Sequence, residues 1–231
     1  MKATLHRYFQ DLLQIVYPNV CLSCGNQLSF QQDFICTTCL HTLPFTNYWE
    51  QTANPMEQHL WGRFAFERAT ALFYFEKLSG VQSLLHELKY RHQKELGIFL
   101  GTLLGEKMKA AMHCQFDYII PVPLHKQKEK QRGYNQAMLF AQGLATALKC
   151  QANAHFIVRK QATETQTHKN LFQRLDNVAT VFELNNATQL ENKHVLLVDD
   201  VLTTGATIEA CALQLNQVKN LRLSIATIAV A

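Results

Sequence analysis

Hydrophobic residues recur along the chain with two different spacings, and these spacings predict alternating strands and helices. Short apolar runs are typical of strands that are buried on both faces. Such runs occur at residues 64–75, 118–123, 155–158, 195–198 and 223–230. An apolar residue every three or four positions is typical of one face of a helix. This spacing occurs at residues 81–90, 94–112, 136–148 and 208–215. Together they predict an α/β fold with a parallel sheet.

The length and composition of the chain narrow the class of protein. It has 231 residues, of which 48% are hydrophobic, and a net charge of +4, which fits one ordinary folded domain with a small appendage. A connector at 42–56 predicts a boundary between residues 1–56 and 57–231. The apolar runs are too short to span a membrane. Residues 1–17 are predicted to form an amphipathic helix and not a secretory signal, so we expect a cytoplasmic protein.

Two Cys-x-x-Cys pairs lie near the N-terminus, Cys21 with Cys24 and Cys36 with Cys39. Four thiolates at this spacing are typical of a structural, tetrahedral Zn²⁺ site. One alternative is a pair of disulfides, which a cytoplasmic setting disfavours. The other is a redox site, which uses a single pair on a βαβ unit. The spacing favours a small zinc-ribbon-like segment that the metal helps to fold.

The apolar run at 195–198 leads directly into Asp199 and Asp200, and then into a loop and a predicted helix. Free backbone N–H groups at the start of a helix can hold a phosphate, and the helix dipole favours its charge. Gly205 lets the backbone approach a ligand closely, and neighbouring threonine hydroxyls add donors. Two adjacent carboxylates suit the hydroxyls of a ribose and can sit near Mg²⁺. The pattern predicts a site for a phosphorylated sugar.

A plain strand-to-helix turn with an acidic cap would show part of the same pattern and implies no function. The full order, however, resembles the phosphoribosyl-diphosphate (PRPP) loop of type I phosphoribosyltransferases, in which four apolar residues precede Asp-Asp and a Thr-Thr-Gly-x-Thr turn. It matches neither the Walker A loop nor the dinucleotide-binding glycine fingerprint. The resemblance implies that Asp199 and Asp200 are the catalytic acid pair. It also implies that PRPP is bound by Val201, Leu202, Thr203, Thr204, Gly205, Ala206 and Thr207.

A basic segment follows the strand predicted at 118–123. The Pro-Val-Pro at its end resembles the approach to the pyrophosphate loop of glutamine-PRPP amidotransferases, but those proteins continue with Asp and Ser-Gly where this chain has Leu-His-Lys. Beside a PRPP loop, these cations are predicted to neutralise pyrophosphate. Taken alone, such a run of charges is more typical of a solvated turn before a helix. The cations are Lys126, Lys128, Lys130 and Arg132.

Two further cations are candidates for the same role. Lys89 ends a predicted helix, where it either reaches pyrophosphate or stabilises the helix C-terminus. Arg174 lies in the polar segment 159–177. That segment is either a loop that closes over PRPP and excludes water, or a surface linker.

The ordered set of motifs resembles the ComF/GntX family over nearly the whole chain. The set comprises the two cysteine pairs, Leu88-Lys89-Tyr90, Pro121-Val122-Pro123-Leu124, Arg132-Gly133-Tyr134-Asn135-Gln136, Thr165-Gln166 with Arg174 and Asn177, and the Asp199–Gly205 loop. The resemblance implies a parallel-sheet type I phosphoribosyltransferase fold with a small N-terminal zinc-ribbon-like segment. It also implies a role in bacterial DNA uptake.

Two hypotheses of function follow. In the first, the protein is an enzyme that transfers ribose 5-phosphate from PRPP, with Mg²⁺, to a nucleophilic acceptor. In the second, it is a non-catalytic protein of the DNA-uptake machinery. Its zinc ribbon and basic segments would then contact single-stranded DNA or a partner protein. Tyr134 and Phe172 are candidates for stacking on bases, and each is equally well a packing residue.

Overall fold

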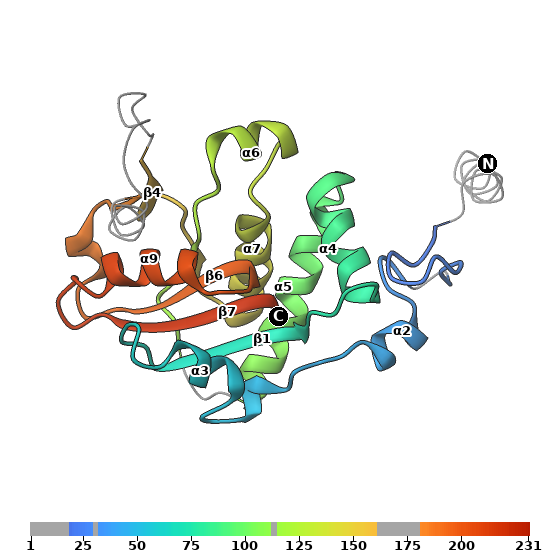
Figure 1. Cartoon of the computed structure of the whole chain (residues 1–231), viewed down its shortest axis with the longest axis horizontal. Helices are drawn as coiled ribbons and strands as arrows, with labels where there is room; N and C mark the ends of the chain where they lie inside the picture. The colour runs from blue at the N-terminus through green and yellow to red at the C-terminus, as the bar shows by residue number, and fades with distance from the viewer. Residues whose placement is uncertain (1–18, 30–31, 112–114, 161–180) are drawn as a thin grey trace, which may run out of the picture.

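A five-stranded parallel sheet forms the centre of the computed structural model (Figure 1). The structure describes residues 19–29, 32–111, 115–160 and 181–231. The sheet has the strand order β1-β7-β6-β2-β3, and every neighbouring pair is parallel. Its strands are β1 (Arg68–Tyr74), β2 (Tyr118–Pro121), β3 (Gln151–Ala152), β6 (His194–Leu202) and β7 (Arg222–Val230). The predicted α/β fold with a parallel sheet is confirmed.

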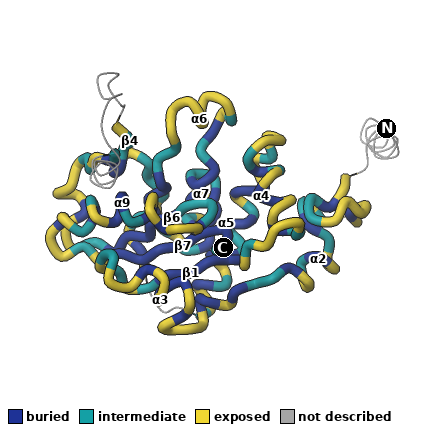
Figure 2. The backbone as a smooth tube through the Cα atoms, in the orientation of Figure 1, coloured by how far each residue is buried: buried dark blue, intermediate teal, exposed yellow. Residues whose placement is uncertain are grey.

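The middle strand, β6, has a packed core on each side. Leu196 and Val198 belong to one cluster of buried residues, while Val195 and Leu197 belong to the other. Successive side chains of a strand point to opposite faces, so the unbroken apolar run of β6 reflects burial on both. Figure 2 shows this buried centre beneath an exposed outer surface.

Helices cover both faces of the sheet (Figure 1). On one face lie α4 (Gly80–Tyr90), α5 (Lys94–Ala111) and α7 (Gln136–Leu148), whose apolar residues share a core with Leu196. On the other lie α3 (Pro55–Leu60) and α9 (Ala206–Leu215), which share the core of Val195. The remaining elements are α2 (Thr37–Thr42), α6 (Lys126–Arg132), η1 (Tyr48–Glu50), η3 (Ala187–Leu190) and an antiparallel ribbon of β4 (Ile157–Arg159) with β5 (Phe182–Leu184).

Helices α5 and α7 touch through glycines. A Cβ atom on Gly101 would lie 2.2 Å from the carbonyl oxygen of Phe140, and one on Gly143 would lie 2.0 Å from that of Ile98. These distances leave no room for a side chain, so the two backbones can approach this closely only with glycine. The contact fixes α7, whose first turn borders the cavity described below.

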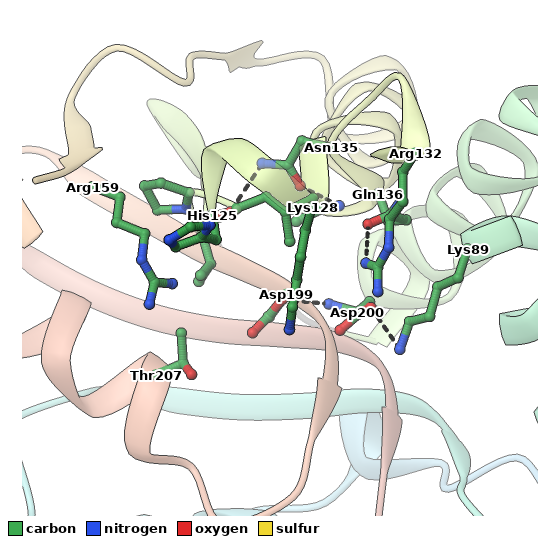
Figure 3. Close-up of a pocket in the computed structure, with 14 residues that line it drawn as sticks. Lys89, His125, Lys128, Arg132, Asn135, Gln136, Arg159, Asp199, Asp200 and Thr207 are labelled. Carbon is green, nitrogen blue, oxygen red and sulfur yellow. Dashed lines mark hydrogen bonds and ion pairs between the residues drawn. The ribbon is translucent and has the colours of Figure 1, made fainter. Parts of the chain in front are cut away.

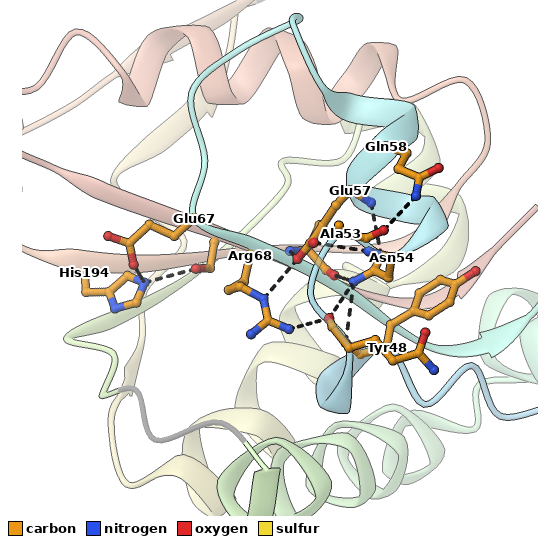
Figure 4. A network of polar contacts seen from close by, with 11 residues as sticks. Tyr48, Ala53, Asn54, Glu57, Gln58, Glu67, Arg68 and His194 are labelled. Carbon is orange, nitrogen blue, oxygen red and sulfur yellow. Dashed lines mark hydrogen bonds and ion pairs between the residues drawn. The ribbon is translucent and has the colours of Figure 1, made fainter.

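A buried polar network joins α3 to β1 (Figure 4). The Asn54 side chain accepts a hydrogen bond from the Glu57 backbone, and the Glu57 side chain accepts one from the Asn54 backbone, which together cap α3. Glu57 Oε1 also accepts bonds from the Ala69 backbone N–H (3.1 Å) and from Arg68 Nε (3.0 Å). Because this carboxylate is almost fully buried, its complete set of partners holds α3 in one position on the sheet.

Most predicted elements occur close to their predicted bounds, and the differences have local causes. The second strand ends at Pro121, one residue after which the Val122 backbone N–H still donates to the Val198 carbonyl oxygen (2.8 Å). Pro123 has no N–H with which to extend the ladder further. The basic segment expected as a turn is the helix α6. The His125 side chain caps its start, and Gly133, with a φ of 78°, ends it. The predictions for residues 1–17 and 161–177 lie outside the described residues.

Within the part of the chain that the structure describes, no helix combines the length and apolar character that crossing a membrane requires.

Candidate functional site

A cavity of about 300 Å³ lies at the carboxyl end of β6 (Figure 3). This is where ligands bind in parallel α/β sheets. Asp199 and Asp200, predicted as the acid pair, line it together with basic residues from three other elements. Its lining comprises Lys89, Val122, Pro123, Leu124, His125, Lys128, Arg132, Asn135, Gln136, Ala137, Arg159, Asp199, Asp200 and Thr207.

The two carboxylates differ in their surroundings. Asp199 Oδ1 accepts a hydrogen bond from the Asp200 backbone N–H (2.8 Å). Burial, and then the charge of Asp200, raise the pKa of Asp199 above its ordinary value. Asp200 Oδ2 lies 2.9 Å from Lys89 Nζ, and its Oδ1 accepts a bond from the Val201 backbone N–H (2.7 Å). The pair therefore consists of one carboxylate whose pKa is raised and one that forms an ion pair with a lysine.

Lys89 reaches the cavity from the last turn of α4. The sequence offered it as a pyrophosphate ligand or as a stabilising charge at a helix end. The structure shows a third arrangement, because its ammonium group forms an ion pair with Asp200 (Figure 3). Lys89 therefore links α4 to the acid pair. An anionic ligand that entered the cavity would meet this cation as well.

Helix α6, which we call the basic arm, borders the cavity on the side of β2 (Figure 3). Lys128 and Arg132 of the arm line the cavity, whereas Lys126 and Lys130 are exposed outside it. The Arg132 guanidinium donates a hydrogen bond to Gln136 Oε1 (2.7 Å) and lies over the ring of Tyr90 (5.5 Å). These contacts keep the charge of Arg132 at the edge of the cavity.

The loop that follows the acid pair encloses a second, smaller hollow of about 30 Å³. We call residues 203–207 the phosphate loop. Gly205 has a φ of 78°, and the first turn of α9 follows it. Among the described residues, no hydrogen-bond partner is found for the backbone N–H groups of Thr204, Gly205 and Thr207. Unpaired N–H groups at the start of a helix form an anion site.

One residue of α3 and one of the α3–β1 connection contact the phosphate loop. Arg63 donates a hydrogen bond to the Thr204 carbonyl oxygen (2.6 Å) and two to Glu209 Oε2 (3.0 and 2.5 Å). His59 Nε2 lies 3.4 Å from the same carbonyl oxygen. Sequence reasoning missed both residues, because no local pattern links them to a loop that follows them by about 140 positions.

The four cysteine Sγ atoms predicted to bind zinc lie within 4.8 Å of one another. Cys21 Sγ accepts a hydrogen bond from the Cys36 backbone N–H (3.3 Å), and Cys36 Sγ accepts one from that of Cys39 (3.4 Å). Four converging thiols with N–H···S bonds fit a tetrahedral Zn²⁺ ion. Cys24 completes the set. The cluster packs against α4, since Cys21 and Cys39 share a core with Val81 and Leu84.

The structure brings together most of the residues that the sequence singled out. Asp199, Asp200, Lys89 and Arg132 meet in one cavity, and residues 201–207 line the adjoining hollow. Arg174 and Phe172 lie outside the described residues. Tyr134 is a packing residue, because it is buried and its hydroxyl donates to the Leu88 carbonyl oxygen. Lys128, one of the predicted cations, lines the cavity as well. His125, Gln136 and Arg159 also line it, and the sequence assigned no individual role to any of these three.

Comparisons with known proteins agree with this geometry. Residues 135–230 match the phosphoribosyl transferase domain. The chain is 35% identical over 133 residues to the DNA utilization protein YhgH of Salmonella typhi, a match that covers 56% of this chain and 58% of that protein. It is 27% identical over 201 residues to competence protein F of Haemophilus influenzae, which covers 81% of this chain and 86% of the relative.

A solved structure of glutamine PRPP amidotransferase from B. subtilis, complexed with ADP and GMP, is similar over 62% of this chain and 30% of its own length. The identity is 15% and the TM-score 0.43. The fold assignment rests on the domain match and on the sheet topology. The chain therefore has a type I phosphoribosyltransferase fold, and it is similar in sequence to competence protein F and to the DNA utilization protein YhgH.

Proposed function

We propose that the cavity at the end of β6 binds PRPP together with Mg²⁺. The observation that carries this proposal is the position of the acid pair between two anion sites of different kinds. On one side is the phosphate loop with its unpaired N–H groups, and on the other is the basic arm. PRPP has the matching order, with a monophosphate at one end, a diol in the middle and a diphosphate at the other end.

Each part of the site then has one role. The phosphate loop holds the 5′-phosphate through backbone N–H groups and threonine hydroxyls. Asp199 and Asp200 accept hydrogen bonds from the ribose hydroxyls. Lys128, Arg132 and Arg159 face the pyrophosphate. The assignment of Arg174 to the same group stays a prediction. Bound Mg²⁺ would neutralise part of the phosphate charge, and the carboxylates are the oxygen ligands in the cavity that suit it.

We further propose that the protein transfers the phosphoribosyl group. In this reaction the bond from ribose C1 to pyrophosphate breaks, the pyrophosphate keeps the electron pair, and an acceptor nucleophile bonds to C1. Positive charge develops on the ribose and negative charge on the leaving group. The acid pair below the ribose stabilises the first charge, and the cations of the basic arm stabilise the second. Such a reaction needs positioned charges and no nucleophilic side chain.

Calorimetric titration with PRPP and Mg²⁺ tests the binding proposal. We expect saturable binding by the wild type and a loss of at least about a hundredfold in affinity for Asp199→Asn with Asp200→Asn, since charged hydrogen bonds contribute about 1.5–3 kcal/mol each. The matched control is Glu76→Gln, which removes an exposed acid that does not line the cavity. Unchanged PRPP binding by the double Asn variant would remove the basis of the proposal.

The cysteine cluster supports a second part of the proposal, a structural Zn²⁺ bound by Cys21, Cys24, Cys36 and Cys39. The metal would fold the N-terminal segment, which we propose is appended to a catalytic domain at 57–231. Elemental analysis should find about one zinc per chain in the wild type. Cys24→Ala should lose it, whereas Cys150→Ala, outside the cluster, should keep it. Equal zinc content in both variants would contradict the assignment.

The names of the relatives support a role in DNA uptake, which we propose for this chain as a cytoplasmic protein. A non-catalytic DNA-binding role is the second candidate. The observation that favours it is the basic arm beside Tyr90, a residue that is 55% exposed. The Arg132 guanidinium lies over the Tyr90 ring. An exposed aromatic ring among cations is a stacking platform for unpaired bases.

Fluorescence titration with single-stranded DNA at two salt concentrations tests this second role. Binding through the arm should weaken as salt rises, because phosphate contacts release counterions. Tyr90→Ala should weaken binding by about tenfold at either salt concentration, as expected for one lost stacking contact. The absence of binding at low salt would exclude DNA contact through the arm and leave the PRPP proposal unaffected.

A further inference from the structure

Arg63 occupies an unusual place, because it contacts the phosphate loop but lines neither the cavity nor the smaller hollow. Its guanidinium joins two parts of the loop region, the Thr204 carbonyl oxygen and the Glu209 carboxylate in the first turn of α9. Arginine suits this position, since its planar group can donate several hydrogen bonds in fixed directions at once. The side chain is only about a quarter exposed, so the contacts are partly shielded from water.

The bond to Thr204 determines the direction of a backbone N–H group. In a planar trans peptide, the carbonyl oxygen and the following N–H point in opposite directions. Arg63 attracts the Thr204 carbonyl to the back of the loop, so the Gly205 N–H is turned to the other side. That N–H is one of the groups without a partner among the described residues. Gly205 also leaves space for the guanidinium, because a Cβ there would lie 2.8 Å from Arg63 Nη1.

The ion pair with Glu209 removes an electrostatic conflict. Glu209 lies in the first turn of α9, one turn from the predicted phosphate position. If Glu209 had no ion-pair partner, its carboxylate would repel a phosphate bound at the start of this helix. Arg63 neutralises it through two hydrogen bonds to the same oxygen, while its third bond orients the loop. The Arg63 side chain thus affects both the charge beside the phosphate loop and the geometry of the loop.

The segment that carries Arg63 is itself fixed. Helix α3 ends three residues before it and is anchored by the Asn54–Glu57–Arg68 network (Figure 4). Leu60 at the end of α3 is completely buried and would lie 3.2 Å from a Cβ on Gly205. The guanidinium is therefore presented from a rigid support, as a preorganised site requires.

We propose that Arg63 is a positioning residue of the phosphate loop, which orients the Thr204–Gly205 peptide for a sugar phosphate and cancels the charge of Glu209. The inference rests on the proposed PRPP site and assigns a role to a residue outside it. The arrangement predicts an effect on one end of the ligand only. A ligand with a 5′-phosphate depends on Arg63, whereas a ligand bound by the basic arm does not.

The test uses two probes, ribose 5-phosphate and pyrophosphate with Mg²⁺, titrated calorimetrically into the full-length protein. Arg63→Met should weaken ribose 5-phosphate binding by about tenfold, as expected for a lost charge-assisted hydrogen bond. Its affinity for pyrophosphate should stay within about twofold. Arg63→Lys should recover part of the loss, because an ammonium group can reach one of the two partners.

The double variant Arg63→Met with Glu209→Gln separates charge from geometry. If Arg63 only cancelled the charge of Glu209, the double variant would bind ribose 5-phosphate as the wild type does. We expect partial recovery, because the Thr204 carbonyl still lacks its donor. Thermal unfolding of each variant shows whether the fold is retained. If Arg63→Met does not fold, the comparison of Arg63→Lys with the wild type gives the same test through its selective loss of ribose 5-phosphate.

Three results would overturn the inference. In the first, Arg63→Met binds ribose 5-phosphate as tightly as the wild type does, and then only the role of Arg63 is wrong. In the second, both probes weaken equally, which indicates a general structural role. In the third, the wild type binds pyrophosphate but not ribose 5-phosphate, which also removes the proposed function of the phosphate loop.

Discussion

The phosphate loop and the basic arm flank the same acid pair but are built in different ways. The loop is short, contains a glycine with a φ of 78° and is held from behind by Arg63. None of the arm's side chains is buried, and the arm is tied to the fold at its two ends. His125 caps its start, and the hydrogen bond from Asn135 to the Val122 carbonyl oxygen anchors the chain after it.

This difference shows that two anion sites can bind their ligands through different interactions, one through fixed backbone N–H groups and the other through charged side chains. The loop offers fixed N–H directions, which suit one phosphate in one place. The arm offers charges on long side chains that are not buried, and these attract phosphate oxygens mainly through their charge. We therefore expect ligand binding at the loop to depend on geometry and binding at the arm to depend on charge and salt. Three predictions examine this contrast.

The largest effect is expected from glycine substitutions, because Gly205 and Gly133 have the same φ of 78° in the two regions. Gly205→Ala strains the backbone and brings a Cβ within 2.8 Å of Arg63 Nη1, so ribose 5-phosphate binding should fall by about a hundredfold. Gly133→Ala strains the end of the arm, where no atom lies within 4 Å of the new Cβ. Calorimetry should show little change in ribose 5-phosphate binding for this control.

If Gly133→Ala weakened ribose 5-phosphate binding more than Gly205→Ala did, the distinction between the loop and the arm would be wrong. Thermal unfolding should accompany both titrations. Each variant is expected to lose about 1–2 kcal/mol of stability from the positive φ alone, so a difference in binding cannot come from that shared cost.

A middle-sized effect is expected from removing the charge of the arm. Lys128→Gln with Arg132→Gln should weaken binding of pyrophosphate with Mg²⁺ by about tenfold at low salt, and the loss should shrink as salt rises. The control is Lys126→Gln with Lys130→Gln, which removes two charges from the same helix outside the cavity. If this control weakens pyrophosphate binding as much, the arm acts only through its overall charge.

The smallest effect concerns the protonation of Asp199, which lies between the two regions. Its pKa is raised in the folded protein by burial and by Asp200. Between the two pKa values, the folded protein holds a proton on Asp199 that the unfolded chain releases. Asp199 therefore stabilises the fold fully at a pH below its ordinary pKa of 3.8, and this contribution is lost as the pH rises through the raised pKa. Relative to the wild type, Asp199→Asn should gain stability in urea unfolding as the pH rises from about 4 to 8.

Asp117 provides the opposite control. The backbone N–H of His194 and then the Lys193 side chain lower the pKa of Asp117. Ionised Asp117 therefore stabilises the fold at a pH above its ordinary pKa of 3.8, and this contribution is lost as the pH falls through the lowered pKa. Asp117→Asn should therefore be less stable than the wild type at neutral pH, by a margin that shrinks in acid. Parallel pH profiles for the wild type and Asp199→Asn would show that Asp199 is an ordinary carboxylate.

The sequence predicted the centre of the site well, because the signals there are local. A strand buried on both faces requires an unbroken apolar run, so residues 195–198 identify β6 and the acids after them lie at its carboxyl end. Asn135 directly precedes the apolar repeat at 136–148 and caps α7, and such a capping pattern is contained within a few residues. The four cysteines carry their own spacing rule, and their Sγ atoms converge as expected.

What the sequence did not predict depends on contacts between distant segments. Arg63 contacts a loop that comes about 140 positions later in the chain. The place of Arg63 depends on the helix before it, which the burial of Leu60 and Glu57 holds on the sheet. Lys89 was considered as a ligand for pyrophosphate, but its partner Asp200 is set by the packing of α4 on the sheet. Tyr134 is buried with its hydroxyl group bonded to the Leu88 carbonyl oxygen of α4. No local sequence pattern indicates this contact.

The most direct test of the central claim is phosphorus NMR of PRPP bound with Mg²⁺, because the 5′-phosphate and the diphosphate give separate signals. In the wild type, both sets of signals should shift and broaden on binding. Gly205→Ala should abolish the change in the 5′-phosphate signal, and Lys128→Gln with Arg132→Gln should reduce the change in the diphosphate signals. If no signal changes in the wild type, or if each variant affects both ends alike, the protein does not hold PRPP between the loop and the arm.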